Sequence, residues 1–222
     1  MPIQPMLARF ATVVVLTAVV AGAALAANPH DPQKRFTSAD QARARTLLVR
    51  RSDLSGAGWR WQVSPDDATC RSFNPNESDL VETGERESPE FNRNGSFVAS
   101  MAAVFRSSAH AQSAWDREMK MHLLDCLAEG LDQTSTSGAT IRIVSKGKLA
   151  YPHLAPRTAA FYVRLAFNVQ GIKFNADLRV VCLGKGRANL ALMTLSPGQP
   201  LMPLPAGLDR RLATKLAQRL DR

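Results

Sequence analysis

The sequence predicts an α+β fold, an antiparallel sheet with flanking helices, and three observations lead to it. Toward the C-terminus three apolar, alternating runs, Thr158–Val169, Ile172–Leu183 and Arg187–Ser196, follow one another with only two or three residues between them. Connections this short join antiparallel neighbours and leave no room for a crossover helix. Segments with helical periodicity stand before, between and after the strands. We therefore expect helices packed on an antiparallel sheet that includes a C-terminal three-strand meander.

The first 26 residues predict a cleavable signal peptide. Arg9 is the single charge among the first ten residues, and the uncharged run Ala11–Leu25 follows it. That run is shorter than the roughly 20 residues that a helix needs to cross a bilayer core, and it ends in small residues. We expect cleavage near Ala26, a secreted, extracytoplasmic protein, and no stable membrane insertion after cleavage. The alternative is a helix retained as an N-terminal anchor.

The remaining chain predicts a flexible arm over residues 27–37 and a single α+β domain over residues 38–222. That length suits one sizeable domain with its own hydrophobic core. Ser38 and Gln41 have the spacing of a capping box and begin a helix that extends to about Arg50. Its buried face is expected to hold Ala39, Ala42, Leu47 and Leu48.

The middle of the chain contains the other predicted strands and the longest predicted helix. In order, the pattern predicts a half-buried strand through Trp59, Trp61 and Val63, a polar loop over residues 66–95 with one short strand at Asp79–Thr83, a strand at Phe97–Phe105, a helix from Ser107 or Ser108 to about Glu129, and a strand through Ile141 and Ile143. The predicted helix has Trp115 and Met119 on its core face.

The C-terminal segment predicts a helix whose leucines, Leu208, Leu212, Leu216 and Leu220, recur every four residues. Arginines and a lysine lie off that stripe. A surface helix that covers the sheet is the favoured interpretation, and a basic helix that binds a membrane is the alternative.

The formal net charge is +9, from 28 basic and 19 acidic residues. The basic residues are spread over most segments, and few aromatic residues stand among them, which does not favour a nucleic-acid partner. Such a surface favours association with anionic polymers or lipid headgroups of the cell envelope.

Three cysteines, Cys70, Cys126 and Cys182, allow one disulfide in an oxidising compartment. Cys182 shares a strand face with apolar residues, as a buried structural thiol does. We predict a disulfide between Cys70 and Cys126, which would contribute roughly 4 kcal/mol in the chain-entropy model. A disulfide between Cys126 and Cys182 is the competing pair.

No motif of the sequence indicates catalysis or a cofactor. The four histidines, His30, His110, His122 and His153, have no carboxylate neighbours at a metal or hydrolase spacing, and no G-x-S-x-G is present. His122 and Cys126 are four residues apart on the predicted helix, where both could reach one zinc ion, but packing is the favoured interpretation. Glu82, Glu85, Glu87 and Glu90 are expected in a solvated loop rather than around a cation.

Short motifs along the chain resemble a known group of exported actinobacterial proteins. They are Leu54-Ser55-Gly56-Ala57-Gly58-Trp59, Cys70, Gly84, Ser88-Pro89-Glu90-Phe91, and Val104-Phe105-Arg106-Ser107 before a helix with Ala111 and Cys126. This layout is similar to the PknH-like extracellular sensor domains of serine/threonine kinases. The resemblance implies an antiparallel sheet flanked by helices, disulfide stabilisation and ligand sensing without chemistry. Two disulfides would need four cysteines, and this chain has three.

The sequence thus predicts a secreted, non-enzymatic, sensor-like module that binds a small ligand or an envelope component, without a cofactor or metal. Two other classes of function stay open. One is an enzyme acting on envelope material, which two carboxylates, or a serine and a histidine, converging in a cleft would favour. The other is an electrostatic binder of anionic envelope polymer, which requires basic residues to gather on one face. A gap in the packing between the meander and the helices that cover it would admit a small apolar ligand.

Overall fold

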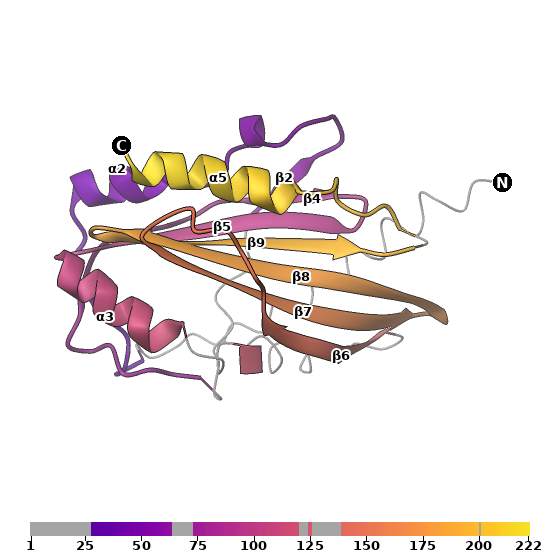
Figure 1. The fold of residues 1–222 in the computed structure, drawn as a ribbon, viewed down its shortest axis with the longest axis horizontal. Helices are drawn as coiled ribbons and strands as arrows, with labels where there is room; N and C mark the ends of the chain where they lie inside the picture. Colours follow the sequence, from indigo (N-terminus) through magenta and orange to yellow (C-terminus); the bar gives the residue numbers. More distant parts are fainter. Residues whose placement is uncertain (1–27, 64–72, 120–123, 126–138, 200) are drawn as a thin grey trace.

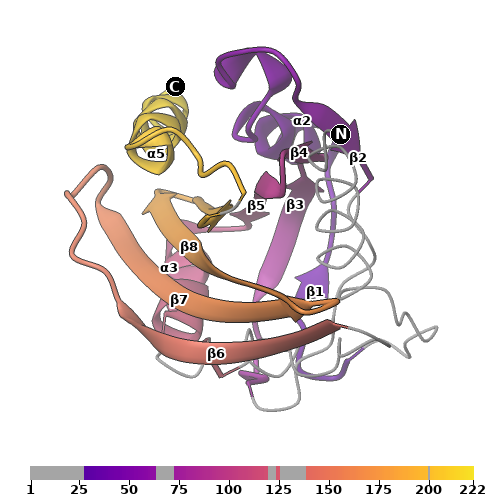
Figure 2. The same ribbon diagram turned by 90° about the vertical axis from the view of Figure 1, so that its right-hand side faces the viewer.

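The computed structural model describes residues 28–63, 73–119, 124–125, 139–199 and 201–222. They form three layers around one sheet: α2 (Ser38–Thr46) and α5 (Leu208–Leu220) cover one face, and α3 (Ser108–Glu118) covers the other (Figure 1). The nine strands of the described chain form one sheet of order β1-β3-β5-β9-β8-β7-β6, with β2 and β4 at its side. Figure 2 shows how strongly this sheet curves. The predicted α+β class with flanking helices is confirmed.

The C-terminal meander is also confirmed. β7 (Arg157–Val169), β8 (Ile172–Lys185) and β9 (Ala188–Pro197) pair in sequence as antiparallel neighbours. Gln170 and Gly171, which join β7 to β8, both have positive φ angles, as a two-residue hairpin turn of this kind requires. On the far side of β7 lies β6 (Ala139–Lys148), the strand predicted through Ile141 and Ile143.

The other half of the sheet is built around β5 (Ser96–Phe105), which pairs antiparallel with β9. Its opposite edge pairs first with β4 (Glu90–Arg93) and then with β3 (Val81–Glu87), while β2 (Arg60–Gln62) adds to β4. The short strand predicted at Asp79–Thr83 overlaps the start of β3, but the polar loop predicted around it is wrong for residues 84–87 and 90–93, which are strands. Their strands follow from pairing with the apolar β5, which their own composition does not reveal.

The described part of the arm predicted over residues 27–37 contains a short strand. β1 (Gln33–Lys34) pairs in parallel with β3. The backbone N–H groups of Gln33, Arg35 and Thr37 donate to the carbonyls of Leu80, Glu82 and Thr83 at 2.8–2.9 Å. The polar sequence of this segment is explained by its edge position, because backbone hydrogen bonds hold it and its side chains stay exposed.

The first helix is shorter than predicted and differently capped. Thr37, not Ser38, is the N-cap, and its side chain accepts from the N–H of Asp40 at 3.1 Å. α2 ends at Thr46, and Ala39 and Ala42 are exposed, contrary to expectation. The buried contact comes from Ala44 together with Leu47, Leu48 and Val49, which follow the helix.

The strand predicted through Trp59, Trp61 and Val63 has a different exposed face than expected. Trp59 is buried just before β2, whereas Trp61 is 68% and Val63 78% exposed. β2 is only three residues long and lies at the side of the sheet, so its alternation does not create a buried face.

α3 begins as predicted and ends earlier. Ser107 is its N-cap and accepts from the N–H of His110, and the helix stops at Glu118 because Met119 leaves helical geometry with ψ 36°. The prediction of a helix to about Glu129 is therefore wrong at Met119. Residues 120–123 and 126–129 of that prediction lie outside the described residues.

α5 covers the sheet as the favoured interpretation predicted. Its stripe Leu208, Leu212, Leu216 and Leu220 is buried in the main hydrophobic core with Val181, Leu183 and Leu192 from the strands. The leucine stripe is therefore not available for insertion into a membrane. Within the described part of the chain, no helix is long and apolar enough to span a bilayer.

Candidate functional site

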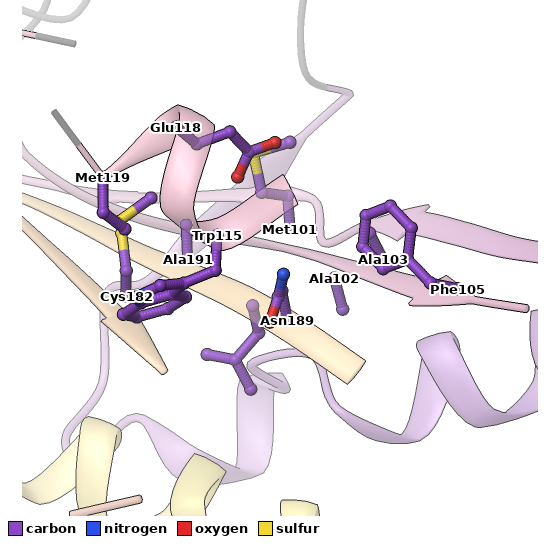
Figure 3. A pocket seen from close by; sticks show the side chains of 11 residues that line it. Met101, Ala102, Ala103, Phe105, Trp115, Glu118, Met119, Cys182, Asn189 and Ala191 are labelled. Atoms are coloured by element: carbon purple, nitrogen blue, oxygen red, sulfur yellow. The ribbon is translucent and has the colours of Figure 1, made fainter. Parts of the chain in front are cut away.

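A pocket of about 80 Å³ lies between α3 and the sheet (Figure 3). Its volume exceeds what one water molecule needs, so it has room for several waters or for a small organic group. Met101 in its wall is 39% exposed, so the pocket reaches the surface. Most of its walls are apolar or weakly polar: Met101, Ala102, Ala103 and Phe105 of β5, Trp115 and Met119 of α3 and its C-cap, Cys182 of β8, and Leu190 and Ala191 of β9.

The periodicity of two elements aims these side chains at one space. Met101, Ala103 and Phe105 alternate along β5 and so share the face toward α3. On α3, Trp115, Glu118 and Met119 are three and four residues apart, which places them on one side of the helix. The two faces meet over β9 and β8.

Asn189 of β9 closes the floor of the pocket but its amide is already satisfied. Its Nδ2 donates to the carbonyl oxygen of Ala111 at 2.9 Å, and its Oδ1 accepts from Nε of Arg157 at 3.2 Å. This buried side chain therefore fixes α3 on the sheet and has a positioning role rather than a free hydrogen bond for a ligand.

Glu118 is the acidic side chain of the pocket, and it is half-buried. Among the described residues, no hydrogen-bond donor or cation contacts its carboxyl group. Burial raises the pKa of Glu118 to about 8, and the nearby carboxylate of Glu77 raises it further. Near neutral pH this side chain is mostly a neutral acid, able to donate one hydrogen bond and accept another.

Cys182 contributes an apolar surface rather than a nucleophile. The thiol is free and fully buried, and burial raises its pKa to about 12, with Glu118 as a smaller cause. A thiolate is the reactive form of cysteine, so the neutral thiol of Cys182 is inert at physiological pH.

Two more buried acids lie close to Glu118. Burial raises the pKa of Glu77 to about 7 and that of Glu82 to about 8, and neighbouring carboxylates add to both shifts. Glu77 is 6% exposed, and its Oε1 has no hydrogen-bond partner. Neither residue lines the pocket, so Glu118 alone presents an acid to it.

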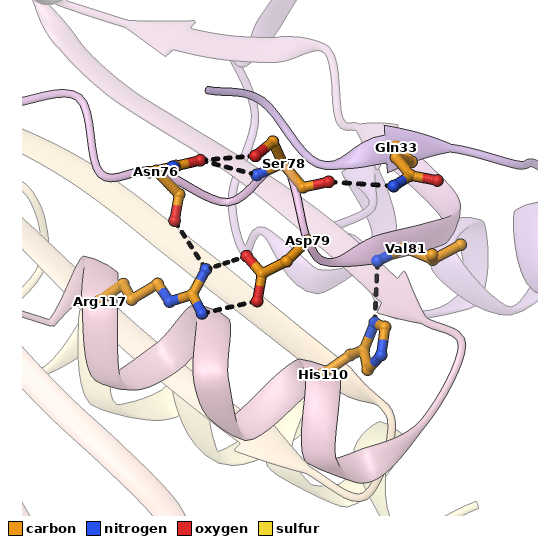
Figure 4. A network of polar contacts seen from close by, with 7 residues as sticks. All are labelled: Gln33, Asn76, Ser78, Asp79, Val81, His110 and Arg117. Atoms are coloured by element: carbon orange, nitrogen blue, oxygen red, sulfur yellow. Dashed lines mark hydrogen bonds and ion pairs between the residues drawn. The ribbon is translucent and has the colours of Figure 1, made fainter. Parts of the chain in front are cut away.

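The loop that carries Glu77 is held against α3 by a polar network (Figure 4). Both guanidinium nitrogens of Arg117 donate to the carboxylate of Asp79, at 2.5 and 2.9 Å, and this hydrogen bonding holds the pKa of Asp79 down at about 2. Nδ1 of His110 accepts from the N–H of Val81 at 2.8 Å. His110 thus orders β3 against α3 and is not aimed at the pocket.

The structure describes some of the residues singled out from sequence and not others. Cys70, Cys126 and His122 lie outside the described residues, so the Cys70–Cys126 disulfide stays a prediction, as do the signal peptide and its cleavage near Ala26. Cys182 is a free buried thiol as expected, and a disulfide from Cys126 to Cys182 is not formed. Within the described ranges, no group of three or more His, Cys, Asp or Glu side chains is placed to hold a metal ion.

The four glutamates predicted in one loop are spread along β3 and β4 instead. Glu82 is buried, Glu85 forms an ion pair with Lys34 at 2.7 Å, and Glu90 accepts from Gln62. The pocket residue that sequence reasoning missed is Glu118. The sequence did indicate it, because Glu118 is an acid directly beside the apolar helix face that Trp115 and Met119 define.

The residues that carry the family resemblance have structural roles. Gly56 and Gly58 adopt positive φ angles, and the guanidinium of Arg93 lies 4.6 Å from the Trp59 ring centre. The hydroxyl of Ser88 accepts from the N–H of Ser100 at 2.9 Å. Gly84 allows the backbone of α2 to approach β3, because a Cβ there would lie 2.4 Å from Asp40.

The comparisons with known proteins give a likeness of structure. No family model and no curated protein matches the chain. The fold is similar to the crystal structure of the extracellular domain of PknH from Mycobacterium tuberculosis, with 10% identity, a TM-score of 0.47, and coverage of 86% of this chain and 98% of that chain. A likeness at this level does not make the chain a member of the PknH-like group.

Proposed function

We propose that this protein is a secreted, non-enzymatic, sensor-like module of the cell envelope that binds a small ligand in the pocket beneath α3. The observation that carries the proposal is Glu118, an acid with no partner among the described residues, in a pocket that is apolar except for Glu118, Asn189 and the Cys182 thiol. A concave apolar site with a small number of directed polar groups is the usual form of a small-molecule site.

The pocket favours a neutral or basic ligand with a short apolar body. Methionine and tryptophan side chains offer polarisable surface to alkyl groups. A hydroxyl or amine would meet the carboxyl group of Glu118, whereas an anion would face Glu118 and nearby Glu77 without a cation in the lining. The site thus discriminates by charge as well as by size.

An enzyme acting on envelope material is supported less by this geometry. The lining residues include one carboxyl group, an inert thiol and an amide that is already satisfied. That set does not combine a nucleophile with a base or two carboxylates in one cleft.

Calorimetric titration with 1-butanol, butylamine and butyrate tests the proposal. We expect 1-butanol and butylamine to bind and butyrate to bind at least tenfold more weakly. Glu118→Leu should weaken the binding of 1-butanol by about two- to tenfold, because one hydrogen bond contributes about 0.5–1.5 kcal/mol. Ala103→Leu should abolish binding by filling the pocket. Ala42→Leu, at an exposed position of α2, should leave binding unchanged. Equal binding of all three probes, or binding unaffected by Ala103→Leu, would reject the site.

A further inference from the structure

The two helices on the face opposite the pocket lie side by side and are tied together by arginines. Nη1 and Nη2 of Arg43 in α2 donate to the carbonyls of Arg219 and Leu220, at 3.1 Å each, at the C-terminal end of α5. Arg219 in turn donates to both carboxylate oxygens of Asp53, at 2.7 and 2.8 Å, in the 3-10 helix η1 (Arg51–Asp53). Both views place α2 and α5 on this same side of the sheet (Figures 1 and 2).

Every acid of these three segments already has a basic partner. Asp40 pairs with Arg187, Asp209 with Arg179, and Asp221 with Lys185, at 2.6–3.0 Å. Asp53 pairs with Arg219, and the ammonium of Lys215 lies farther from it at 3.8 Å. The carboxylates of this side are thus all paired, and none is left to neutralise its other cations.

Five exposed cations are left on this side, and we call them the basic face: Arg45, Arg50, Arg51, Arg210 and Arg211. Arg50, Arg51 and Arg211 donate only to backbone carbonyls, and Arg45 and Arg210 have no hydrogen-bond or ion-pair partner among the described residues. The positive charge that the sequence spreads over many segments is therefore locally uncompensated here.

We propose that the basic face docks this protein on an anionic lipid surface. The five cations come from α2, from α5 and from η1 with its N-cap, which the hydrogen bonds of Arg43 and Arg219 hold together on one side of the sheet. Trp61 of β2 is 68% exposed, and Figure 2 draws β2 next to α2. A tryptophan at this position suits the interface of a bilayer. The leucines of α5 are buried, so the contact is peripheral and electrostatic.

Co-sedimentation of the secreted protein with vesicles tests this proposal independently of the pocket. The vesicles contain phosphatidylglycerol mixed with phosphatidylcholine, or phosphatidylcholine alone. We expect binding only to the anionic vesicles and its loss in high salt, since exposed charges are screened. Each basic residue near such a surface changes affinity by about fivefold. The triple variant Arg45→Gln, Arg210→Gln and Arg211→Gln should therefore bind about 100-fold more weakly.

A matched control variant distinguishes binding through the basic face from a general effect of net charge. Arg142→Gln, Lys148→Gln and Lys173→Gln remove the same charge from exposed positions on β6 and β8, and this variant should bind within about threefold of the wild type. Equal losses in the two triple variants would overturn the proposal, as would failure of the wild type to bind anionic vesicles. Retention on soluble polyglutamate without retention on the vesicles would contradict a lipid partner and indicate a polymer instead.

Discussion

Glu118, Glu82 and Glu77 show how burial changes the chemistry of a single residue type. All three have pKa values raised to about 7–8, in each case chiefly by burial. Asp79, 63% exposed and bonded to Arg117, is shifted the other way. Location rather than residue type therefore decides which acid is neutral at physiological pH.

The raised pKa of Glu118 makes stability fall with pH. Between its unfolded value of 4.5 and its folded value of about 8, the folded state binds more protons than the unfolded state, so the free energy of unfolding decreases as pH rises. Glu118→Gln removes this dependence. We expect the stability advantage of Glu118→Gln over the wild type to grow by roughly 2 kcal/mol between pH 6 and pH 9 in urea denaturation.

Asp79→Asn is the control for that measurement. The pKa of Asp79 is lowered to about 2, so its linkage acts in acid and should add no divergence from the wild type between pH 6 and pH 9. A gap for Glu118→Gln that stays constant over this range would show that Glu118 is ionised and solvated in the folded protein.

For single residues, prediction from sequence succeeded where the neighbouring residues along the chain alone indicated the environment. Cys182 was predicted as a buried thiol from its strand face, and the structure has it so. Glu118 was missed because its neutralisation depends on Glu77 and on the strands that bury it, and these are far away in the sequence.

Elements were predictable where periodicity was undisturbed. The meander β7–β8–β9 and α5 follow directly from alternation, short turns and a four-residue leucine repeat. Most of β3 and all of β4 were predicted as loop, because their charged and small residues form strands only through pairing with β5. Nor does local sequence show that β5 lies beside β9, although this pairing brings the pocket walls together.

The packing of α2 on β3 depends on Gly84. A Cβ at this position would lie 2.4 Å from backbone atoms of Asp40, which cannot move without shifting the helix. Gly84→Ala should lower the free energy of unfolding by about 2 kcal/mol or more in chemical denaturation. Gly147→Ala, whose Cβ would meet the movable Tyr162 ring at 3.2 Å, should cost less than about 1 kcal/mol. Equal costs would contradict the close approach of α2.

The contact between η1 and α5 rests on one nearly buried ion pair. The side chains of Asp53 and Arg219 are 7% and 18% exposed, and Arg219 also donates to the Leu48 carbonyl at 2.6 Å. A double-mutant cycle with Asp53→Asn and Arg219→Gln should give a coupling energy of about 1–3 kcal/mol. The exposed pair Lys185–Asp221 should give about 0.5 kcal/mol or less. Similar coupling in both cycles would remove the special role of Asp53.

At the scale of the whole molecule, the sheet separates two surfaces of different chemistry. One side carries the apolar pocket with its neutral acid, and the other carries the basic face. In our two proposals, the pocket takes up a small ligand while the basic face holds the protein on an anionic lipid surface.

The predictions of export and of one disulfide concern the whole chain, and one experiment tests both. Intact-mass spectrometry of the natively secreted protein should give a mass that begins near Ala27 and includes one disulfide. Cys182 should react with a thiol reagent only after unfolding, because it is fully buried. Reduction should lower the stability by about 2–4 kcal/mol if Cys70 and Cys126 are joined. A retained Met1, or three thiols that react in the unfolded, unreduced protein, would contradict both predictions.

The binding of a small ligand beneath α3 is tested most directly by NMR of protein labelled with ¹³C at the methionine methyl groups. Met101 and Met119 line the pocket, and Met202 is 64% exposed elsewhere. With 1-butanol present, intermolecular NOEs from its alkyl chain should appear at the methyl groups of Met101 and Met119 and disappear in Ala103→Leu. NOEs that favour Met202, or none at Met101 and Met119 at saturating 1-butanol, would contradict the proposed site.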